Sequence, residues 1–463
     1  MDDRTTRRVA EDPLSVVVVA GEPSGDRQGA ALVEALRLRA APRSIRTWGI
    51  GGDAMRAAGI ALRHDSMAWG SIGIANALAH VPHLIGVTAD MRRALRADPP
   101  DALVVIDFGA FNVPLARWAK THQVCPVFYY FPPGSWRRTA RTGRRSRLAG
   151  AVDRVVTPFP WSETLLRQAK IDAHFVGHPL LDLVHPSLSE TTFCDRYGLD
   201  PRRPIIALLP GSRRIEITHI LPALLGAAGE IARRIPSAQF ALALASPTAR
   251  AQVEEIIRRE QRQGGRGARL QLLMHQAGDR LAQIAQTTLT PPLLATSEGL
   301  TLPAPLPEEN TPAAPSDRAA PAPLVICDGL TYDVLGHSDL ALIKSGTSTL
   351  EAAILGKPMI IVYRGPALMA LEWRLRRKSL NIAHVGLPNI LAQERVFPEL
   401  IQDEATPEAI SDIAVEMLLQ PERLLHVKQK LADLVKTTLG EAGGVTRAAD
   451  LLYDLMTTSK QDA

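Results

Sequence analysis

Cysteine is scarce in this chain of 463 residues, which contains only Cys125, Cys194 and Cys327. An odd number of cysteines at wide spacing argues against a disulfide framework and a cysteine-based zinc site, so we expect these side chains to be small buried hydrophobes. The sequence also lacks a Gly-x-x-x-x-Gly-Lys-Ser/Thr phosphate loop and a His-Glu-x-x-His metal motif, and the glycines at 49–52 lack the full dinucleotide spacing. These absences exclude the corresponding zinc, phosphate-loop and dinucleotide signatures, and we expect neither a metal ion nor a cofactor.

Long apolar runs are missing as well, since no stretch approaches the roughly 18 continuous apolar residues that a membrane span requires. Residues 1–12 form a polar tail without the apolar centre of a secretory signal, so we expect a cytoplasmic protein. The formal net charge of +5 suits anionic partners, and basic residues cluster at 137–147 and 374–378. Each cluster is either a solvated helix face or a contact for phosphates or a membrane, and we expect no nucleic-acid partner.

Short β-branched runs followed by turns recur along the chain. Residues 15–20 (SVVVVA) lead at once into the turn GEPSGD and then into an amphipathic segment at 28–39. Residues 103–107 end in the same way, and residues 205–209 precede the turn PGSRR. Strands covered by helices on both faces of a parallel sheet read as such continuous apolar runs. The sequence therefore predicts an α/β protein with Rossmann-like, doubly wound parallel sheets.

Further apolar runs and two breaks predict the domain organisation. Additional strands are expected at 127–131, 154–157, 240–243, 340–344 and 359–363. The Pro- and Asp-rich residues 199–204 separate two series of strands, and nine of the 35 prolines lie between 291 and 323, a composition typical of disorder. We therefore expect a first domain at 13–199, a second at 200–385 with a disordered insertion at 291–323, and a helical segment at 386–463 that returns toward the first domain.

Residues just after the strands are the candidates for a site, because ligands of doubly wound sheets bind beyond the carboxyl ends of the strands. Asp107 closes an apolar strand, where a carboxylate is costly unless it is paired or used. It could act as a general base if desolvation raises its pKa, or it could serve in a cap or turn. Arg213 follows another strand, where its guanidinium could bind phosphate oxygens or simply lie in a surface turn.

The segment SGTSTLE at residues 345–351 combines a glycine, hydroxyls and the free amides of a helix start, which together suit a diphosphate. Glu351 lies one turn into that helix, where it could accept hydrogen bonds from ribose hydroxyls or merely complement the helix dipole. His178 is isolated from other metal-type ligands, so a turn or hydrogen-bonding role is favoured over metal ligation.

An unusually apolar segment covers residues 72–85. It belongs either to the core or to a surface helix whose apolar face suits acyl chains or a membrane interface. That face would present Ile74, Ala77, Leu78, Val81, Leu84 and Ile85.

In their order and in their amino-acid sequences, these motifs resemble those of the lipid-A-disaccharide synthase family over about residues 16–402, apart from the Pro-rich insertion. The motifs that carry the resemblance are AGEPSGD at 20–26, GIGGDAM at 49–55, SIGI at 71–74, PDALVVID at 100–107, FVGHPLLD at 175–182, LLPGSR at 208–213, SGT at 345–347 with TLE at 349–351, and LPNILA at 387–392.

The resemblance implies a metal-independent, inverting glycosyltransferase of the GT-B fold, in which two Rossmann-like domains face a central cleft. Its donor would be a UDP-linked 2,3-diacylglucosamine and its acceptor 2,3-diacylglucosamine 1-phosphate, giving a β-1,6-linked disaccharide and UDP. The resemblance further implies contact with lipids at the cytoplasmic face of the inner membrane as a peripheral protein, and we expect a homodimer as one option.

Site residues carry over by matching position. Asp107 corresponds to the family's essential aspartate and Arg213 to its essential arginine. The residues expected to bind UDP are Gly211, Ser212, Arg213, Ser345, Gly346, Thr347, Thr349, Glu351 and Asn389. Those expected in the acceptor and donor loops are Glu22, Ser24, Gly25, Asp26, Asn112 and His178. Those expected at the membrane or the acyl chains are Ile74, Leu78, Val81, Leu84 and Ile85.

The chain departs from the family's usual pattern near the acceptor and the nucleotide. Residues 106–112 read IDFGAFN, which keeps the first aspartate of the usual Ile-Asp-Ala-Pro-Asp-Phe-Asn and loses the second. Asn76 stands where a glutamate is usual, Gln393 and Glu394 change the usual Ala-Gly-Arg, and Lys344 precedes SGT where a small residue is common. Three hypotheses stay open: the family's own reaction, the same donor with another acceptor, and a non-catalytic UDP-sugar-binding protein.

Overall fold

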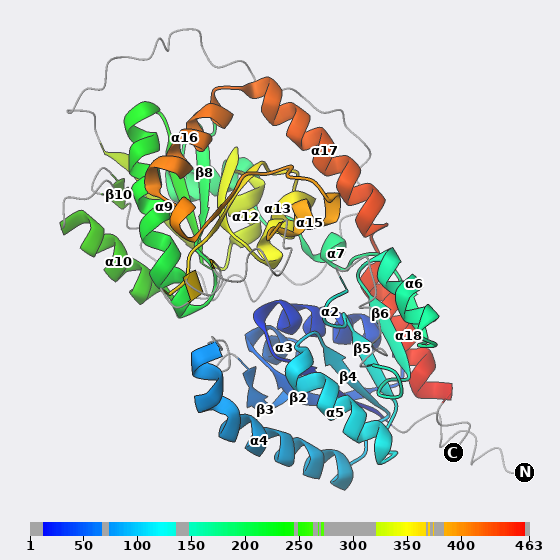
Figure 1. The fold of residues 1–463 in the computed structure, drawn as a ribbon. Helices are drawn as coiled ribbons and strands as arrows, with labels where there is room; N and C mark the ends of the chain where they lie inside the picture. Colours follow the sequence, from blue (N-terminus) through cyan, green and yellow to red (C-terminus); the bar gives the residue numbers. More distant parts are fainter. Residues whose placement is uncertain are drawn as a thin grey trace, which may run out of the picture.

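The chain folds into two lobes, and the described residues of each lobe form a parallel seven-stranded sheet (Figure 1). The computed structural model describes residues 13–66, 74–135, 148–244, 249–262, 267, 270–272, 321–366, 369–370, 374 and 384–458. Within these residues all strand pairs are parallel and helices flank both sheets, which confirms the predicted α/β, doubly wound fold class. The basic cluster at 137–147, most of the one at 374–378, and residues 291–320 of the expected insertion lie outside the described part.

The first lobe contains the strands in the order β3-β2-β1-β4-β5-β6-β7. Their bounds are β1 (Leu14–Ala20), β2 (Ile45–Gly51), β3 (Ala61–Asp65), β4 (Ala102–Ile106), β5 (Val127–Tyr130), β6 (Arg154–Thr157) and β7 (Ala173–Phe175). The central strands β1 and β4 are buried along their whole length, because helices cover both faces of the sheet.

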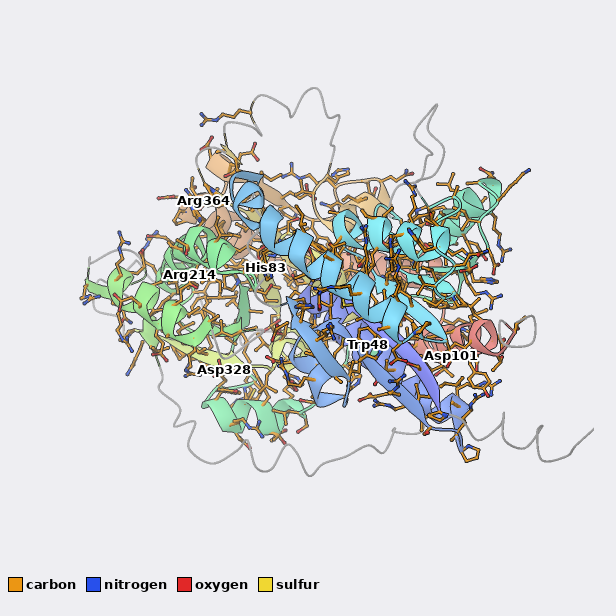
Figure 2. The ribbon with its side chains drawn as sticks, turned by 90° about the horizontal axis from the view of Figure 1, so that it is seen from below. Trp48, His83, Asp101, Arg214, Asp328 and Arg364 are labelled. Atoms are coloured by element: carbon orange, nitrogen blue, oxygen red, sulfur yellow. The ribbon has the colours of Figure 1, made fainter. Side chains whose placement is uncertain are left out.

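Two pairs of helices sandwich this sheet. On one face, α4 (Ile74–Ala97) and α5 (Gly109–Thr121) contribute Met91, Leu95 and Leu115 to the core. On the other face, α2 (Pro23–Ala40) packs together with the C-terminal helix α18 (Gly444–Thr458). Figure 2 shows α4, marked by His83, lying with α5 across the first lobe. The shorter helices are α3 (Asp53–Ala57), α6 (Pro160–Gln168) and α7 (Leu180–Leu183).

The second lobe contains the strands in the order β10-β11-β9-β8-β12-β13-β14. Their bounds are β8 (Ile205–Leu209), β9 (Gln239–Leu244), β10 (Leu270–Leu272), β11 (Ala322–Asp328), β12 (Leu340–Lys344), β13 (Met359–Tyr363) and β14 (Glu399–Ile401). One face is covered by α9 (Arg214–Arg234), α10 (Arg250–Arg262) and α16 (Pro407–Leu418). The other is covered by α8 (Glu190–Tyr197), α12 (Thr331–Gly336), α13 (Thr347–Ile354) and α17 (Pro421–Leu439).

The structure moves the expected domain boundaries. Helix α8 lies in the segment assigned to the first domain, yet its Phe193 and Cys194 are buried in the core of the second sheet. The second lobe also continues beyond residue 385, because α15 (Leu387–Ala392), β14, the short 3-10 helix at Gln402–Glu404 and α16 follow there. Strand β11 begins at Ala322, within the expected insertion. Local composition marks loops and breaks, but it does not say with which sheet a flanking helix packs.

The end of the chain crosses back to the first lobe. Figure 1 shows α17 running along the second lobe and α18 lying beside the first. The carboxylate of Asp182, on α7, accepts hydrogen bonds from the amides of Gly443 and Val445 at the start of α18. Arg39 of α2 forms an ion pair of 2.7 Å with Asp450 of α18. Helix α18 therefore fastens the two lobes to each other.

One described helix, α9, is long and apolar enough to cross a membrane. Of its apolar window, 72% is buried inside the protein, where it lies between the second sheet and α16. This burial identifies α9 as a core helix of the second lobe, with polar residues such as Arg214 and Thr218 on its exposed face.

Candidate active site

The turn after β4 holds Asp107 in a strained backbone conformation. Asp107 and Phe108 both adopt positive φ angles, 44° and 37°, which residues other than glycine rarely do. Such conformations persist only where their surroundings enforce them, and they concentrate at functional sites. Here the ring of Phe108 lies over Gly21, where an added Cβ would come within 2.4 Å of it. The glycine after β1 is thus required by the turn after β4.

Hydrogen bonds from two neighbours fix this turn. The side-chain amide of Asn112, on α5, donates to the carbonyl oxygens of Ile106 and Asp107 at 2.8 and 3.0 Å. The hydroxyl of Tyr129, on β5, donates to the same carbonyl of Asp107 at 2.7 Å. Asn112 is fully buried, so it positions the backbone of Asp107 and is not itself open to a ligand.

The carboxyl of Asp107 has a raised pKa. Surrounding protein removes solvent from it and the negative charge of Glu22 repels a second anion, and together these effects raise the pKa of Asp107 from 3.8 to about 6. The residue is nevertheless exposed. A carboxyl that is accessible but crowded by protein suits a general base, because its pKa lies near the pH at which it would accept a proton.

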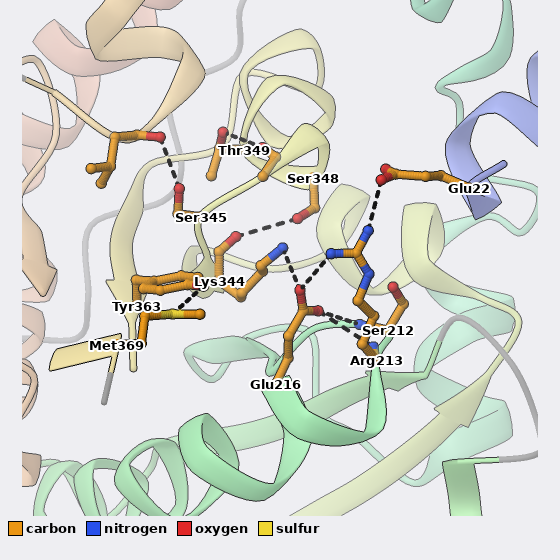
Figure 3. A network of polar contacts seen from close by, with 12 residues as sticks. Glu22, Ser212, Arg213, Glu216, Lys344, Ser345, Ser348, Thr349, Tyr363 and Met369 are labelled. Carbon is orange, nitrogen blue, oxygen red and sulfur yellow. Dashed lines mark hydrogen bonds and ion pairs between the residues drawn. The ribbon is translucent and has the colours of Figure 1, made fainter. Parts of the chain in front are cut away.

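A cross-lobe ion pair brings this carboxyl near Arg213. Glu22 begins α2 in the first lobe, and its Oε1 lies 2.8 Å from Nη2 of Arg213, which precedes α9 in the second lobe (Figure 3). Glu22 therefore acts electrostatically on Asp107 and pairs directly with Arg213. Glu22 thus interacts with both residues assigned to catalysis from the sequence.

The start of α9 is arranged around the buried Glu216. Its carboxylate accepts hydrogen bonds from the amides of Ser212 and Arg213 at 3.2 and 3.3 Å, and completes a capping box. Gly211 has a φ of 112°, and a Cβ there would lie 2.4 Å from this carboxylate. The amides of Ser212 and Arg213 are therefore already occupied, whereas the side chains of these two residues, which we expect to bind UDP, are not buried. Glu216 is itself buried, being 8% exposed.

The turn from β12 into α13 carries the other predicted phosphate residues, Ser345, Gly346 and Thr347, all half-buried. The hydroxyl of Ser345 donates a hydrogen bond of 2.8 Å to the carbonyl of Val385. This bond holds the turn against the segment just before α15. Thr349 is fully buried and donates to the carbonyl of Gly346 at 2.7 Å. The first amides of a helix have no partner within the helix, so the start of α13 offers donors to an anion. The buried Thr349 therefore stabilises the backbone of this turn and is not itself open to a ligand.

A second cross-lobe ion pair reaches Glu351. Its buried carboxylate lies 2.8 Å from Nη2 of Arg27, on α2, and accepts a hydrogen bond of 3.1 Å from the hydroxyl of Tyr332, on α12. Arg27 also lies over the ring of Tyr332, 5.5 Å from its centre. The carboxylate expected to bind ribose is therefore held by both lobes.

Two motif residues of the first lobe support the fold around the site. Asp26 is buried, and its carboxylate accepts hydrogen bonds from the amides of Gly52, Ala54 and Met55 at 2.7 to 3.1 Å. It joins the turn after β1 to the turn after β2, the two motifs GEPSGD and GIGGDAM. Gly25 allows α2 to approach Ile106, whose methyl would lie 3.4 Å from an added Cβ. Ser24 lies half-buried beside it.

Asn389 and His178 do not present their side chains to a ligand. Asn389 is fully buried and bonds to the amide and carbonyl of Phe397 and to the carboxylate of Glu399, so it fastens α15 to β14. His178 is buried, accepts a hydrogen bond from the amide of Leu180 and stacks on Phe131. Burial lowers the pKa of His178 to about 3, so it stays neutral. Their surroundings support structural roles in place of the expected contacts with substrate.

The segment expected to contact a membrane forms the first part of α4. The side chains of Ile74, Leu78 and Val81 lie outside the described part. Leu84 is half-buried against the first lobe's core, whereas Ile85 is 63% exposed.

The described residues contain no group of three or more His, Cys, Asp or Glu side chains that could hold a metal ion. The expectation of a metal-independent reaction therefore stays a prediction. Two residues that pair with predicted site residues were missed from the sequence, Arg27 and Tyr332, whereas Lys344 was noted only as a departure from the family pattern. Arg27 directly follows the GEPSGD motif, but its partner is 324 residues away, and no local pattern indicates that pairing.

Comparison with known proteins agrees with this architecture. The profile of the lipid-A-disaccharide synthetase family matches residues 16–276 and 313–448. The lipid-A-disaccharide synthase of Syntrophus aciditrophicus is 33% identical over 444 residues, which cover 96% of this chain and 98% of that protein. The corresponding synthase of Geobacter metallireducens is 33% identical over 444 residues, covering 95% and 97%.

Solved structures share the fold at low sequence identity. A UDP-GlcNAc 2-epimerase from Neisseria meningitidis, bound to UDP-GlcNAc, has a TM-score of 0.53 and 11% identity and covers 96% of this chain and all of that one. The spinosyn rhamnosyltransferase SpnG, complexed with thymidine diphosphate, has a TM-score of 0.50 and 13% identity, covering 96% and 99%. With its profile match over most of the sequence and its relatives above 30% identity, this chain belongs to the lipid-A-disaccharide synthetase family and is a glycosyltransferase.

Proposed function

We propose that this glycosyltransferase moves a 2,3-diacylglucosamine unit from its UDP derivative to an acylated glucosamine 1-phosphate, forming lipid A disaccharide 1-phosphate and UDP. Family membership supports the reaction, and one observation supports its location. After the loss of solvent, the charge of Glu22 is the second cause that raises the pKa of Asp107 in the first lobe, and Glu22 is bonded to Arg213 of the second. These two interactions of Glu22 support the proposal that Asp107 and Arg213 act in one site.

In the proposed reaction, Asp107 accepts the proton of the acceptor's 6-hydroxyl. The hydroxyl oxygen forms a bond to the anomeric carbon of the donor, while the bond from that carbon to the diphosphate breaks and its electron pair leaves with UDP. In-line attack inverts the configuration. A carboxyl with a pKa of about 6 is mostly ionised at neutral pH and is a stronger base than an ordinary aspartate.

Negative charge that develops on the diphosphate needs positive charge and amide donors in a fixed arrangement. Arg213 offers a guanidinium that can bind two phosphate oxygens, and the first turn of α13 offers amides. Glu22 and a diphosphate compete for Arg213, because both are anions. We therefore propose that donor binding replaces the bond between Glu22 and Arg213.

The direct test is the variant Asp107→Asn, assayed for UDP release and, separately, for UDP affinity by calorimetry. Loss of a general base is expected to lower turnover by about 10²- to 10⁴-fold while UDP affinity stays unchanged. A matched control is Asp98→Asn, which removes an exposed ion pair with Arg46 in the same lobe and should leave turnover intact. Near-normal turnover of Asp107→Asn would remove this residue from the mechanism.

Product analysis separates the remaining alternatives. Mass spectrometry of reactions with different acylated glucosamine acceptors identifies the product, and a product from another acceptor alone would assign the same donor to a different reaction. Measurable UDP binding without UDP release in the presence of any acceptor would favour a non-catalytic UDP-sugar-binding protein.

We also propose that the protein acts as a peripheral protein at the cytoplasmic face of the inner membrane, since both proposed substrates carry acyl chains. The exposed Ile85 on α4 supports a contact through this helix.

A further inference from the structure

Lys344 lies at the start of α13 and has no role in the reaction described so far. It is the last residue of β12, and its Nζ lies 2.9 Å from Oε1 of Glu216. A Cβ added to Gly346 would lie 3.0 Å from the same Nζ. The ammonium group is therefore held against the backbone turn that leads into α13, between the starts of α9 and α13 (Figure 3).

Glu216 does not need this lysine to serve as a cap. Its Oε2 accepts the amides of Ser212 and Arg213, which completes its part in the capping box. Its Oε1 faces two cations, Lys344 at 2.9 Å and Nη1 of Arg213 at 3.8 Å. One carboxylate thus orients two positive side chains toward the same region, and the side chains of Glu216 and Lys344 are only 9% and 18% exposed.

The charges of this network balance only while the lobes are bonded to each other. Glu22, Arg213, Glu216 and Lys344 alternate in sign and sum to zero. When Glu22 leaves Arg213, two cations remain beside one carboxylate that is already engaged by backbone amides. The net positive charge that results lies beside the helix start proposed to receive the diphosphate.

We propose, building on the function proposed above, that Lys344 is a second diphosphate-contacting cation of the donor site, acting together with Arg213. Glu216 holds the ammonium group in place before the donor arrives. As the bond between the anomeric carbon and the diphosphate breaks, the electron pair moves to the phosphate oxygen. The ammonium group of Lys344, a compact positive charge, then stabilises the negative charge on that oxygen.

The test compares UDP with uridine, which lacks both phosphates. Calorimetry of Lys344→Met is expected to show UDP affinity weakened by about tenfold, as for loss of one charge-assisted hydrogen bond, with uridine affinity unchanged. Lys344→Arg keeps the charge and should recover most of the UDP affinity. The matched control is Lys357→Met, because Lys357 lies beyond the carboxyl end of α13 and donates to the carbonyl of Ser338; it should bind both ligands as the wild type does.

The outcomes separate this inference from the proposed function. If Lys344→Met loses UDP and uridine affinity equally, the lysine is structural and the inference fails. If Lys344→Met binds UDP as tightly as the wild type, and the wild type releases UDP from the donor, the inference fails and the proposed function stands. If the wild-type protein neither binds UDP nor releases it from a UDP-sugar, the proposed function fails first.

Discussion

Removing the charge of Glu22 should shift the pH dependence of the reaction. The pKa of Asp107 is raised from 3.8 to about 6, first by loss of solvent around the carboxyl and second by the charge of Glu22. In Glu22→Gln the second cause disappears and the first remains. A base works when it is deprotonated, so activity rises with pH through its pKa, and lowering that pKa moves the acidic limb to lower pH.

The structure bounds the size of this shift. The whole increase in the pKa of Asp107 is about two units, and burial is its larger cause. The charge of Glu22 is the smaller of the two causes that raise this pKa, so the acidic limb of kcat/KM should move from near pH 6 to a lower pH without reaching the ordinary aspartate value of 3.8.

The assay is UDP release measured from pH 4.5 to 8.5 at low donor concentration. Only the midpoint of the acidic limb is interpreted, because the variant also removes the partner of Arg213 and can change the absolute rate. The control is Glu34→Gln, an identical change at an exposed position of the same helix, which should leave the midpoint in place. An unchanged midpoint in Glu22→Gln, or a shift toward higher pH, would refute the electrostatic coupling and with it the assignment of Asp107 as the titrating base.

Three further predictions concern stability and membrane contact. Because the folded state raises the pKa of Asp107, ionisation of this carboxyl destabilises the folded protein as pH rises from about 4 to 6. The variant Asp107→Asn should therefore unfold in urea with a free energy about 1 kcal/mol higher than that of the wild type above pH 7, a value reduced for solvent screening. Below pH 4 the two proteins should be equally stable. Arg27→Met leaves the buried Glu351 with only its tyrosine partner, so unfolding free energy should fall by about 1–2 kcal/mol, and an unchanged value would show the ion pair to be incidental. Ile85→Glu should reduce co-sedimentation with anionic vesicles several-fold, whereas Leu38→Glu, at an 82% exposed position, should not; equal effects would contradict a specific contact through α4.

The locations of several strands follow from local patterns. Residues 154–157, 340–344 and 359–363 were predicted as strands and form β6, β12 and β13 with the same bounds. The centres of these runs are apolar, as expected for strands of a parallel sheet with both faces covered. The edge strand β3 was not predicted, because its residues alternate between exposed and half-buried and include three charged or polar side chains.

Long-range partners could not be predicted in this way. The sequence places Asp107 and Arg213 after strands, but nothing near either residue indicates that Glu22 interacts with both. Similarly, Asn389 and Asp26 occur in motifs shared with the family, yet the folded protein buries both and uses them to join neighbouring turns and strands.

The sequence by itself determined that this chain forms parallel α/β sheets, that polar residues gather where the strands end, and which family it resembles. Those properties depend on apolar periodicity and turn residues within short windows of chain. Only the tertiary structure decided that α8 belongs to the second lobe, that α18 returns to the first, and that Glu22 and Arg27 reach across to Arg213 and Glu351. The reason is physical: the pairing of charges 191 and 324 residues apart depends on the relative position of two folded lobes, which no local segment encodes.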